Sequence, residues 1–214
     1  MAKPARDGAG PRRQPRQSRS IETYQSILDA AVELFAASGY EQTTTHQIAG
    51  RAGISVGALY RYFADKQAIV TELYRQEVSD MRNRVLATFN LSDIITQDIP
   101  ELVRKTVALA FKLSSERPGL RKVLNEQSRK IPELVDLRRS HERDVHQTVR
   151  QILTAAPGVR LPDIEAGAYL ITLFIDSLIE DHIQHRRDQV ELDDERLIDA
   201  AVDFVVRYAL GRVD

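Results

Sequence analysis

The chain has 214 residues, enough for one large or two small domains with a hydrophobic core. Hydrophobic residues make up 43% and charged residues 29%, as in an ordinary globular protein, and the absence of cysteine excludes disulfide bonds and thiolate chemistry. No apolar run approaches the length of a membrane span, and the first twenty residues lack the apolar core of a secretory signal, so we expect a cytoplasmic protein with no membrane partner.

Charge is distributed unevenly, although the formal net charge is only -1. Residues 1–66 hold nine Lys/Arg and six Asp/Glu, a balance of +3, whereas the remainder holds 21 and 25, a balance of -4. A basic end suggests a polyanionic partner. Residues 1–20 carry most of the excess and are rich in Pro, Gly, Gln and Ser, so we predict a disordered basic tail there. Its composition leaves open whether the tail is only solvated or also contacts the phosphates or minor groove of DNA.

The first helix is predicted over residues 21–38, where apolar residues recur at intervals of three and four. Ser20 can cap its start, and Gly39 can adopt the left-handed conformation that ends it. The residues on its apolar face are Tyr24, Ile27, Leu28, Ala31, Leu34 and Phe35.

Two short helices follow. Thr44 and Gln47 have the spacing of a capping box at the start of one, and Gly53 marks its end. Ser55 can cap the next, which runs to about Tyr62. Two short helices joined by the sequence AGIS form a helix-turn-helix.

The rest of the chain is also predicted to be helical. Asp65 can cap a helix to about residue 89, and sustained strand-type alternation is absent. Further helices are predicted near 99–116, 119–128, 131–156, 163–186 and 193–211, four of them with proline near the start. We therefore predict an all-α fold. Its parts are the tail (1–20), a helix-turn-helix domain (21–66) and a larger helical domain (67–214).

The helix-turn-helix provides the candidate DNA contacts, because the second helix of this unit enters the major groove. Short side chains at its start allow close approach, Val56 could contact a thymine methyl, and Arg61 could reach a guanine or a phosphate. Tyr60 and Tyr62 offer hydroxyls to phosphates, with a core role as the alternative; for Phe63 we expect the core. The candidates are Thr44, Thr45, His46, Ser55, Val56, Gly57, Ala58, Tyr60, Arg61, Tyr62 and Lys66.

Residues 21–89 resemble the DNA-binding domain of the TetR (tetracycline repressor) family of transcriptional regulators. The resemblance lies in ILDAAVELFAASGY and in TTTHQIAGRAGISVGALYRYFADKQAI. It implies phosphate contacts by Tyr60, Tyr62 and Lys66, and base reading by positions 55–58 and 61. It also implies a homodimeric repressor that leaves DNA when a small molecule enters the C-terminal domain. Val56 departs from the pattern, since many members carry a basic or polar residue there, so the operator sequence is not predicted.

The last two predicted helices are apolar over more of their circumference than one core-facing stripe needs. They could pair with their copies as a four-helix interface, as the resemblance also implies. A core formed entirely within one chain is the alternative. The expected interface residues are Phe174, Ile175, Leu178, Ile198, Val202 and Val205.

An effector pocket is expected among residues 99–186, with an apolar lining and a few polar groups. The candidates, each of which could instead be plain core, are Phe89, Phe111, Leu124, Asn125, Val149, Tyr169 and Thr172. His141 and His146 are five residues apart and so not on one helix face, and neither a metal nor another cofactor is expected.

We therefore expect a sequence-specific DNA-binding regulator, a homodimeric repressor of palindromic operators that a small-molecule effector releases. An activator or a ligand-independent regulator with the same reading domain is the alternative. An enzyme is not expected, because there is no Gly-rich phosphate loop, nucleophile–base arrangement or metal-ligand set.

Overall fold

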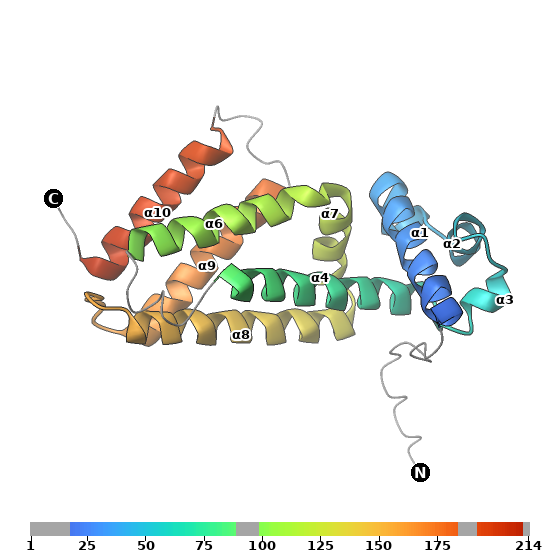
Figure 1. Cartoon of the computed structure of the whole chain (residues 1–214), viewed down its shortest axis with the longest axis horizontal. Coiled ribbons are helices and arrows are strands. Elements are labelled where there is room, and N and C mark those ends of the chain that lie inside the picture. The colour runs from blue at the N-terminus through green and yellow to red at the C-terminus, as the bar shows by residue number, and fades with distance from the viewer. Residues whose placement is uncertain (1–17, 89–98, 184–191, 212–214) are drawn as a thin grey trace, which may run out of the picture. The chain divides into compact units, whose positions relative to one another are not determined.

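A computed structural model describes residues 18–88, 99–183 and 192–211, and these residues form helices and no strands. The all-α prediction is confirmed. Residues 1–17, which make up most of the predicted tail, lie outside the described part of the chain. The helices are α1 (Ser18–Gln42), α2 (Thr45–Arg51), α3 (Val56–Leu59), α4 (Lys66–Thr88), α6 (Ile99–Glu116), α7 (Pro118–Gln127), α8 (Pro132–Ala155), α9 (Ile164–Ile183) and α10 (Asp194–Leu210) (Figure 1).

Side-chain caps begin the short helices where the sequence predicts them. The Thr44 amide donates to Gln47 Oε1 at 2.8 Å, and the Gln47 amide donates to Thr44 Oγ1 at 3.2 Å, which completes the capping box of α2. The Ala58 amide donates to the Oγ of Ser55 at 3.1 Å at the start of α3. Each cap satisfies an amide that has no partner inside its helix, which helps to fix where these short helices start.

The first helix differs from the prediction at its start. It already includes Ser18, so Ser20 lies inside the helix and does not cap it. At the other end Gly39 has φ 78° and ψ 170°, which interrupts the helical geometry; its φ is positive as predicted, but its ψ is extended and α1 continues to Gln42 instead of ending there. Side chains other than glycine rarely adopt this positive φ.

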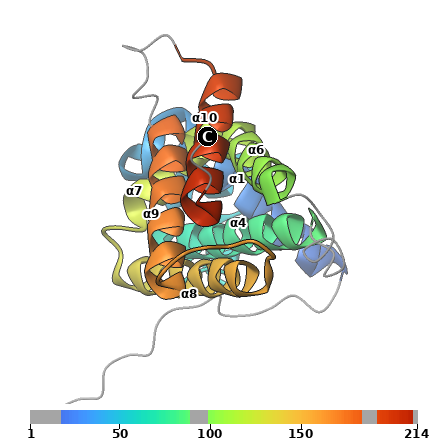
Figure 2. The same cartoon turned by 90° about the vertical axis from the view of Figure 1, so that its left-hand side faces the viewer.

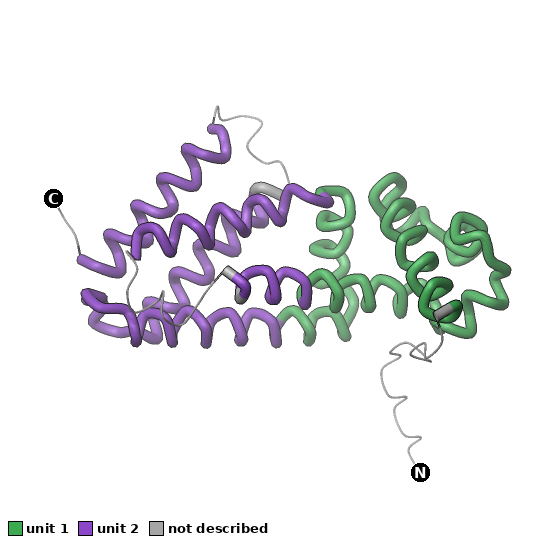
Figure 3. The backbone as a smooth tube through the Cα atoms, viewed as in Figure 1, with its two compact units in different colours: residues 1–78, 118–138 green, residues 79–117, 139–214 purple. Residues whose placement is uncertain are grey.

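The chain forms two compact units, and each is formed from segments that are separated in the sequence (Figure 3). Unit 1 comprises residues 1–78 and 118–138, and unit 2 comprises residues 79–117 and 139–214. This division differs from the predicted boundary after residue 66. The first part of α4, all of α7 and the start of α8 belong to the same unit as the helix-turn-helix.

Unit 1 has one continuous apolar core, to which α1, α2, α3, α4, α7 and the start of α8 all contribute. Phe35, Leu59 and Phe63 are almost fully buried in it. Helix α7 packs closely on α1 because Gly119 has no side chain: a Cβ there would lie 2.9 Å from that of Ala36.

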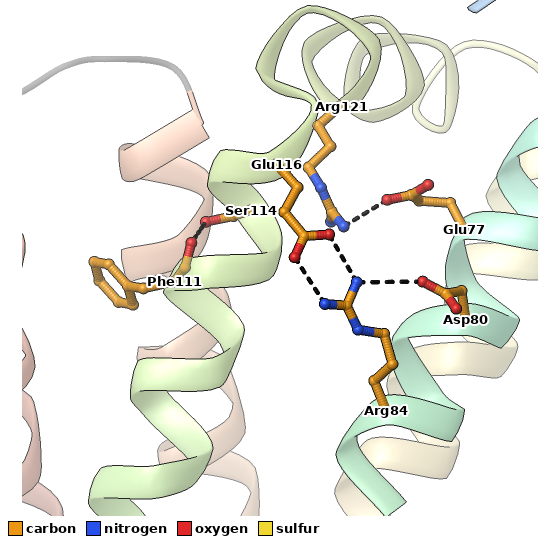
Figure 4. Close-up of polar contacts among 7 residues, drawn as sticks. All are labelled: Glu77, Asp80, Arg84, Phe111, Ser114, Glu116 and Arg121. Atoms are coloured by element: carbon orange, nitrogen blue, oxygen red, sulfur yellow. Dashed lines mark hydrogen bonds and ion pairs between the residues drawn. The ribbon is translucent and has the colours of Figure 1, made fainter. Parts of the chain in front are cut away.

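Two ion pairs join the later helices of unit 1 to α4. Arg121 of α7 contacts the Glu77 carboxylate at 2.5 Å, as Figure 4 shows, and both side chains are largely buried. Arg75 contacts Glu133 of α8, also at 2.5 Å. A buried ion pair of this kind holds two helices in one register, since removing either partner leaves an uncompensated charge.

Unit 2 is organised around α6, α9 and α10, which pack on one another (Figure 2). Its apolar contacts include Val107, Phe111 and Ala201. At the C-terminal end of α6, Arg84 forms a two-pronged ion pair with Glu116, with both N–O distances 2.7 Å (Figure 4). No helix of the described residues is both long enough and apolar enough to cross a membrane.

Candidate nucleic-acid interface

Helix α3 presents short or polar residues outward from a buried anchor. Leu59 is fully buried, whereas Ser55, Gly57 and Arg61 are exposed. The Arg61 side chain makes no ion pair with any described residue and is available to a partner. Ala58 is half-buried between them.

Gly57 is exposed and unobstructed. A Cβ built on it would have no heavy atom within 4 Å, so nothing inside the protein requires a glycine there. Val56 differs, because its half-buried side chain packs against the core of unit 1. The valine is therefore partly used in packing, which reduces the surface that it can offer to a thymine methyl.

Two tyrosine hydroxyls lie beside hydroxyls of other helices. The Tyr60 hydroxyl is 3.1 Å from Thr45 Oγ1 of α2, and the Tyr62 hydroxyl is 3.2 Å from Ser20 Oγ of α1. Each pair brings two hydroxyl groups to one place, an arrangement that suits a phosphate oxygen because hydroxyls can donate to it. Ser20 was missed as a site residue, and no sequence signal marks a serine whose importance depends on a residue 42 positions away.

The neighbouring aromatic residues belong to the core. Phe63 is fully buried and stacks on Tyr24 with ring centroids 5.0 Å apart, as expected for a core phenylalanine. Burial is also the main reason why the pKa of Tyr24 is raised, with the carboxylate of Glu72 adding to the effect. Burial, reinforced by the charges of Glu41 and Asp65, raises the pKa of Tyr40 to about 12. Both phenols therefore stay protonated at neutral pH.

Lys66 has hydrogen-bond partners inside the chain in the DNA-free structure. Its ammonium donates to the carbonyl oxygens of Tyr40 at 2.6 Å and Thr43 at 2.9 Å, and it lies 4.1 Å from the centroid of the Tyr40 ring. Because the Lys66 ammonium already binds carbonyl oxygens near the end of α1, a phosphate would have to compete with these partners.

The remaining candidates lie at the start of α2. Thr44 and His46 are exposed there, and Thr45 is half-buried. Arg51, at the other end of α2, contacts Glu33 of α1 at 2.5 Å. That exposed ion pair supports the orientation of α2 on α1, although exposed pairs contribute little to stability.

Few basic residues of the described head remain available to a polyanion. Residues 18–66 contain four Lys/Arg and five Asp/Glu. Two of the four basic side chains, Arg51 and Lys66, already have partners within the chain. The other five Lys/Arg of the first 66 residues all fall within residues 1–17.

The predicted pocket residues do not form one group. Leu124 lies in the core of unit 1 with Asn125 beside it on α7, whereas Phe111 and Val149 pack in unit 2. Phe89 lies outside the described residues. Thr172 is buried, with its hydroxyl donating to the Ala168 carbonyl at 2.9 Å. Tyr169 is 59% exposed, so its assignment to an enclosed pocket was wrong: it lies on the outer side of α9.

The predicted dimer residues lie on the inner faces of α9 and α10. Val202 and Val205 are buried within unit 2, and Phe174, Ile175, Leu178 and Ile198 are partly buried against its core. The prediction named both the helices and the residues of the dimer contact. The six predicted side chains face the core of unit 2, so they contribute to the fold of a single chain. The exposed apolar residues of the two helices are Tyr169, Leu170, Leu173, Phe204 and Tyr208, and we call them the outer face. The sequence does contain a signal for this face: residues 169 and 173, and residues 204 and 208, are four apart and therefore lie on one side of their helix.

These features define a class: helical transcriptional regulators with an N-terminal helix-turn-helix and a separate C-terminal domain. Residues 27–73 match the family described as "Bacterial regulatory proteins, tetR family", and residues 98–208 match "Tetracyclin repressor-like, C-terminal domain". The chain belongs to the TetR family of transcriptional regulators.

Several known proteins are similar to it. The fatty acid metabolism regulator protein of Bacillus subtilis is 26% identical over 147 residues, 67% of this chain and 69% of that protein. The A-factor receptor protein of Streptomyces griseus is 39% identical over 64 residues, only 30% of this chain and 23% of that protein.

Solved structures extend the similarity to most of the fold. A transcriptional regulator from Rhodococcus sp. Rha1 has a TM-score of 0.68 at 21% identity, covering 89% of this chain and 98% of that chain. The fatty acid degradation regulator FadR from Bacillus halodurans has a TM-score of 0.66 at 18% identity, covering 90% and 96%. The family, the B. subtilis relative and both solved structures are named as regulators, which confirms the prediction of a regulator rather than an enzyme.

Proposed function

We propose that the protein is a homodimeric repressor that acts in the cytoplasm, binds palindromic operators and is released by a small-molecule effector. The observation that carries the proposal is the open start of α3, with Gly57 unobstructed and Arg61 exposed beside a buried Leu59. An activator or a ligand-independent regulator with the same head is the alternative.

In this proposal α3 enters the major groove. Ser55, Gly57 and Ala58 allow the backbone to approach the base edges, and Arg61 reads a guanine or holds a phosphate. The hydroxyl pairs Thr45–Tyr60 and Ser20–Tyr62 bind phosphates on either side of the groove. Thr44 and His46 contact the backbone at the start of α2.

The outer face of α9 and α10 is proposed to bind a second copy of the chain. It comprises Tyr169, Leu170 and Leu173 of α9 and Phe204 and Tyr208 of α10, each 37% exposed or more. Helices α9 and α10 contact each other through the rings of Phe174 and Phe204, whose centroids are 4.5 Å apart. Large apolar side chains exposed on two neighbouring helices support an interaction site. To read half-sites about one turn of DNA apart, a two-fold dimer needs its two α3 helices separated by about 34–36 Å, or somewhat more.

The basic tail is proposed to supply positively charged phosphate contacts, because the described head has few available Lys or Arg side chains. Five Lys/Arg and one Asp fall within residues 1–17. A variant lacking residues 2–17 should bind the operator with a smaller salt dependence, by about 0.9 in the slope of log K against log salt for each phosphate that the tail neutralises. An unchanged slope would assign the tail to solvent.

The effector is proposed to be derived from a fatty acid. Support comes from the B. subtilis relative, which is named for fatty acid metabolism and matches two thirds of this chain. Binding is assigned to unit 2, whose helices carry the wide apolar faces. A series of fatty acids and fatty acyl thioesters of graded chain length should raise the melting temperature and weaken operator binding. No response to any member of the series would contradict this effector class.

Selection of bound duplexes from a random DNA pool tests the reading function. We expect an enriched palindrome, bound with a steep inverse dependence on salt. Binding without enrichment of any sequence would contradict an operator-reading role.

A matched pair of glycines tests the placement of α3 in the groove. Gly57 and Gly50 are both exposed, and neither would bring a Cβ within 4 Å of another heavy atom. Gly57→Gln and Gly50→Gln should therefore both fold normally. The first should lower operator affinity by about tenfold or more because the longer side chain meets the bases, whereas the second should not. Equal affinities for the two variants would remove the start of α3 from the interface.

A further inference from the structure

Arg75 contacts two carboxylates that come from different helices of unit 1. Its guanidinium lies 2.5 Å from Glu133 in the first turn of α8 and 3.9 Å from Glu72, three residues earlier on α4. The three side chains are between 16% and 35% exposed, so salt screens these contacts less than it screens a fully exposed pair. Helix α8 continues from Glu133 past residue 138 into unit 2.

The Glu72 carboxylate also acts on Tyr24 of α1. Burial is the main reason why the pKa of Tyr24 is raised; a side-chain hydrogen bond to Glu72 raises it further, and the positive charge of Arg75 opposes the rise. Gln76 donates its side-chain amide to Glu72 Oε1 at 3.1 Å. An ionised carboxylate can accept several hydrogen bonds, so these neighbours together hold Glu72 in one orientation.

The Tyr24 ring packs against the aromatic end of the helix-turn-helix. It stacks on Phe63 with ring centroids 5.0 Å apart and meets the Tyr62 ring edge-on at 6.3 Å. The Tyr62 hydroxyl in turn lies 3.2 Å from Ser20 Oγ. Because Phe63 holds the ring of Tyr24 and Glu72 holds its hydroxyl, Tyr62 packs against a side chain that is fixed at both ends.

We propose that Arg75 is a positioning residue: acting through Glu72 and Tyr24, it fixes where the phosphate-binding hydroxyl at the end of the helix-turn-helix lies. That hydroxyl belongs to Tyr62, and the proposal rests on the DNA-binding role proposed for it above. The contact between Arg75 and Glu133 makes the start of α8 part of this arrangement.

An ion pair that only stabilises unit 1 is the alternative. In that case, loss of the Glu133 charge would lower the stability of the folded protein but would leave the surroundings of the Tyr62 hydroxyl unchanged. Positioning requires that the surroundings of Tyr62 change while the protein remains folded. The two accounts therefore differ in a property of the DNA-free protein.

Fluorine NMR of the DNA-free protein measures that property. 3-Fluorotyrosine replaces the seven tyrosines, and Tyr→Phe variants assign the resonances. Glu133→Gln nearly keeps the side-chain volume and removes the charge that Arg75 contacts, so the Tyr24 and Tyr62 resonances should both shift. Neither should shift in Arg104→Gln, which breaks an exposed ion pair of unit 2. An unshifted Tyr62 resonance in folded Glu133→Gln would overturn the proposal.

A double-mutant cycle on operator affinity then tests whether the contact matters for binding. Glu133→Gln and Tyr62→Phe should each weaken binding by about fivefold per protomer, the value of about one hydrogen bond. The double variant should lose little more than either single variant, because both changes remove the same phosphate contact. Losses that multiply in the double variant would overturn the proposal.

Arg75→Met distinguishes positioning from a direct phosphate contact. It should lower operator affinity with an unchanged salt slope, whereas a slope lowered by about 0.9 per protomer would identify Arg75 itself as a phosphate contact and overturn the proposal. If Glu133→Gln does not fold, Tyr24→Phe, which removes only the hydroxyl beside Glu72, replaces it in the cycle with the same expected result. Because the NMR measurement needs no DNA, failure of this proposal is distinguishable from failure of DNA reading, which the duplex selection tests.

Discussion

Unit 1 and unit 2 both have apolar cores, but they differ in the polar contacts that accompany the packing. In unit 1, directed polar contacts fix each connection: the capping box of α2, the cap of α3, the Thr43 hydroxyl and the Lys66 ammonium. In unit 2, α6, α9 and α10 pack mainly through apolar faces, and cross-helix ion pairs such as Arg104–Asp199 are exposed. Directed contacts specify one geometry, whereas apolar faces tolerate rearrangement and leave surface for partners. This difference suits the proposed function, in which the head matches DNA and the second unit responds to an effector.

The largest expected effect breaks the core of unit 1. Phe63→Ala should lower the free energy of unfolding by about 3–5 kcal/mol, because the ring is fully buried and stacked on Tyr24. Tyr62→Phe is the control, since it removes only the hydroxyl that faces Ser20. Urea unfolding measures both. A decrease below about 1 kcal/mol for Phe63→Ala would contradict the assignment of this residue to the core.

A second pair of variants compares the buried and the exposed face of α9. Ile171 is 7% exposed and Leu173 is 49% exposed. Ile171→Ala should cost about 2–4 kcal/mol in unfolding free energy, whereas Leu173→Ala should leave the fold almost unchanged and weaken self-association. Urea unfolding and sedimentation give the two quantities. Unaltered self-association in Leu173→Ala, or in a further Leu173→Glu variant, would argue against the outer face as the dimer contact.

A third pair of variants compares close packing at a glycine in unit 1 with close packing at a glycine in unit 2. A Cβ at Gly119 would lie 2.9–3.1 Å from Ala36 atoms, two of them backbone, whereas a Cβ at Gly167 would meet the end of the Leu161 side chain at 2.5 Å. Backbone cannot move aside as easily as a leucine methyl. Gly119→Ala should therefore destabilise by about 1–3 kcal/mol, and Gly167→Ala should stay within about 1 kcal/mol of wild type. Thermal unfolding with equal destabilisation in both variants would show that the two contacts are equally rigid.

The smallest effect is a pH dependence from unit 2. Burial lowers the pKa of His141, and Arg82 lowers it further, against the opposing charges of Asp144 and Glu142. The folded protein thus binds this proton less readily than the unfolded chain. The resulting stability is fully present above the unfolded pKa of about 6.5 and is lost as pH falls through the folded value. Urea unfolding at pH 7.5 and 5.5 should show a smaller decline in His141→Gln than in wild type; equal declines would contradict this role.

Short-range signals predicted the starts of α2 and α3 and the break in helical geometry at Gly39. Thr44 with Gln47, Ser55 and Gly39 all act within a few residues of where they stand, so their spacing is readable in the sequence. The partners of Lys66, the pairing of Ser20 with Tyr62, and the inclusion of α7 in unit 1 depend on residues far apart in the chain. The periodicity of apolar residues along the sequence does not predict such long-range contacts.

The faces of α9 show a second limit. Both faces are rich in apolar residues, so composition alone gives no reason to assign Phe174 or Ile175 to the core of the unit and Leu170 or Leu173 to the outside. Only packing against α6 and α10 decides which face is left exposed.

Amide hydrogen exchange of the full chain, free and bound to the selected operator duplex, tests the DNA-reading head most directly. We predict new protection at Thr44–Gln47 and Ser55–Arg61, together with unchanged exchange along α9 and α10, where the proposed dimer contact would already be formed in the free protein. Protection confined to other helices, or none at all in the presence of a bound duplex, would contradict the DNA-reading role of α2 and α3.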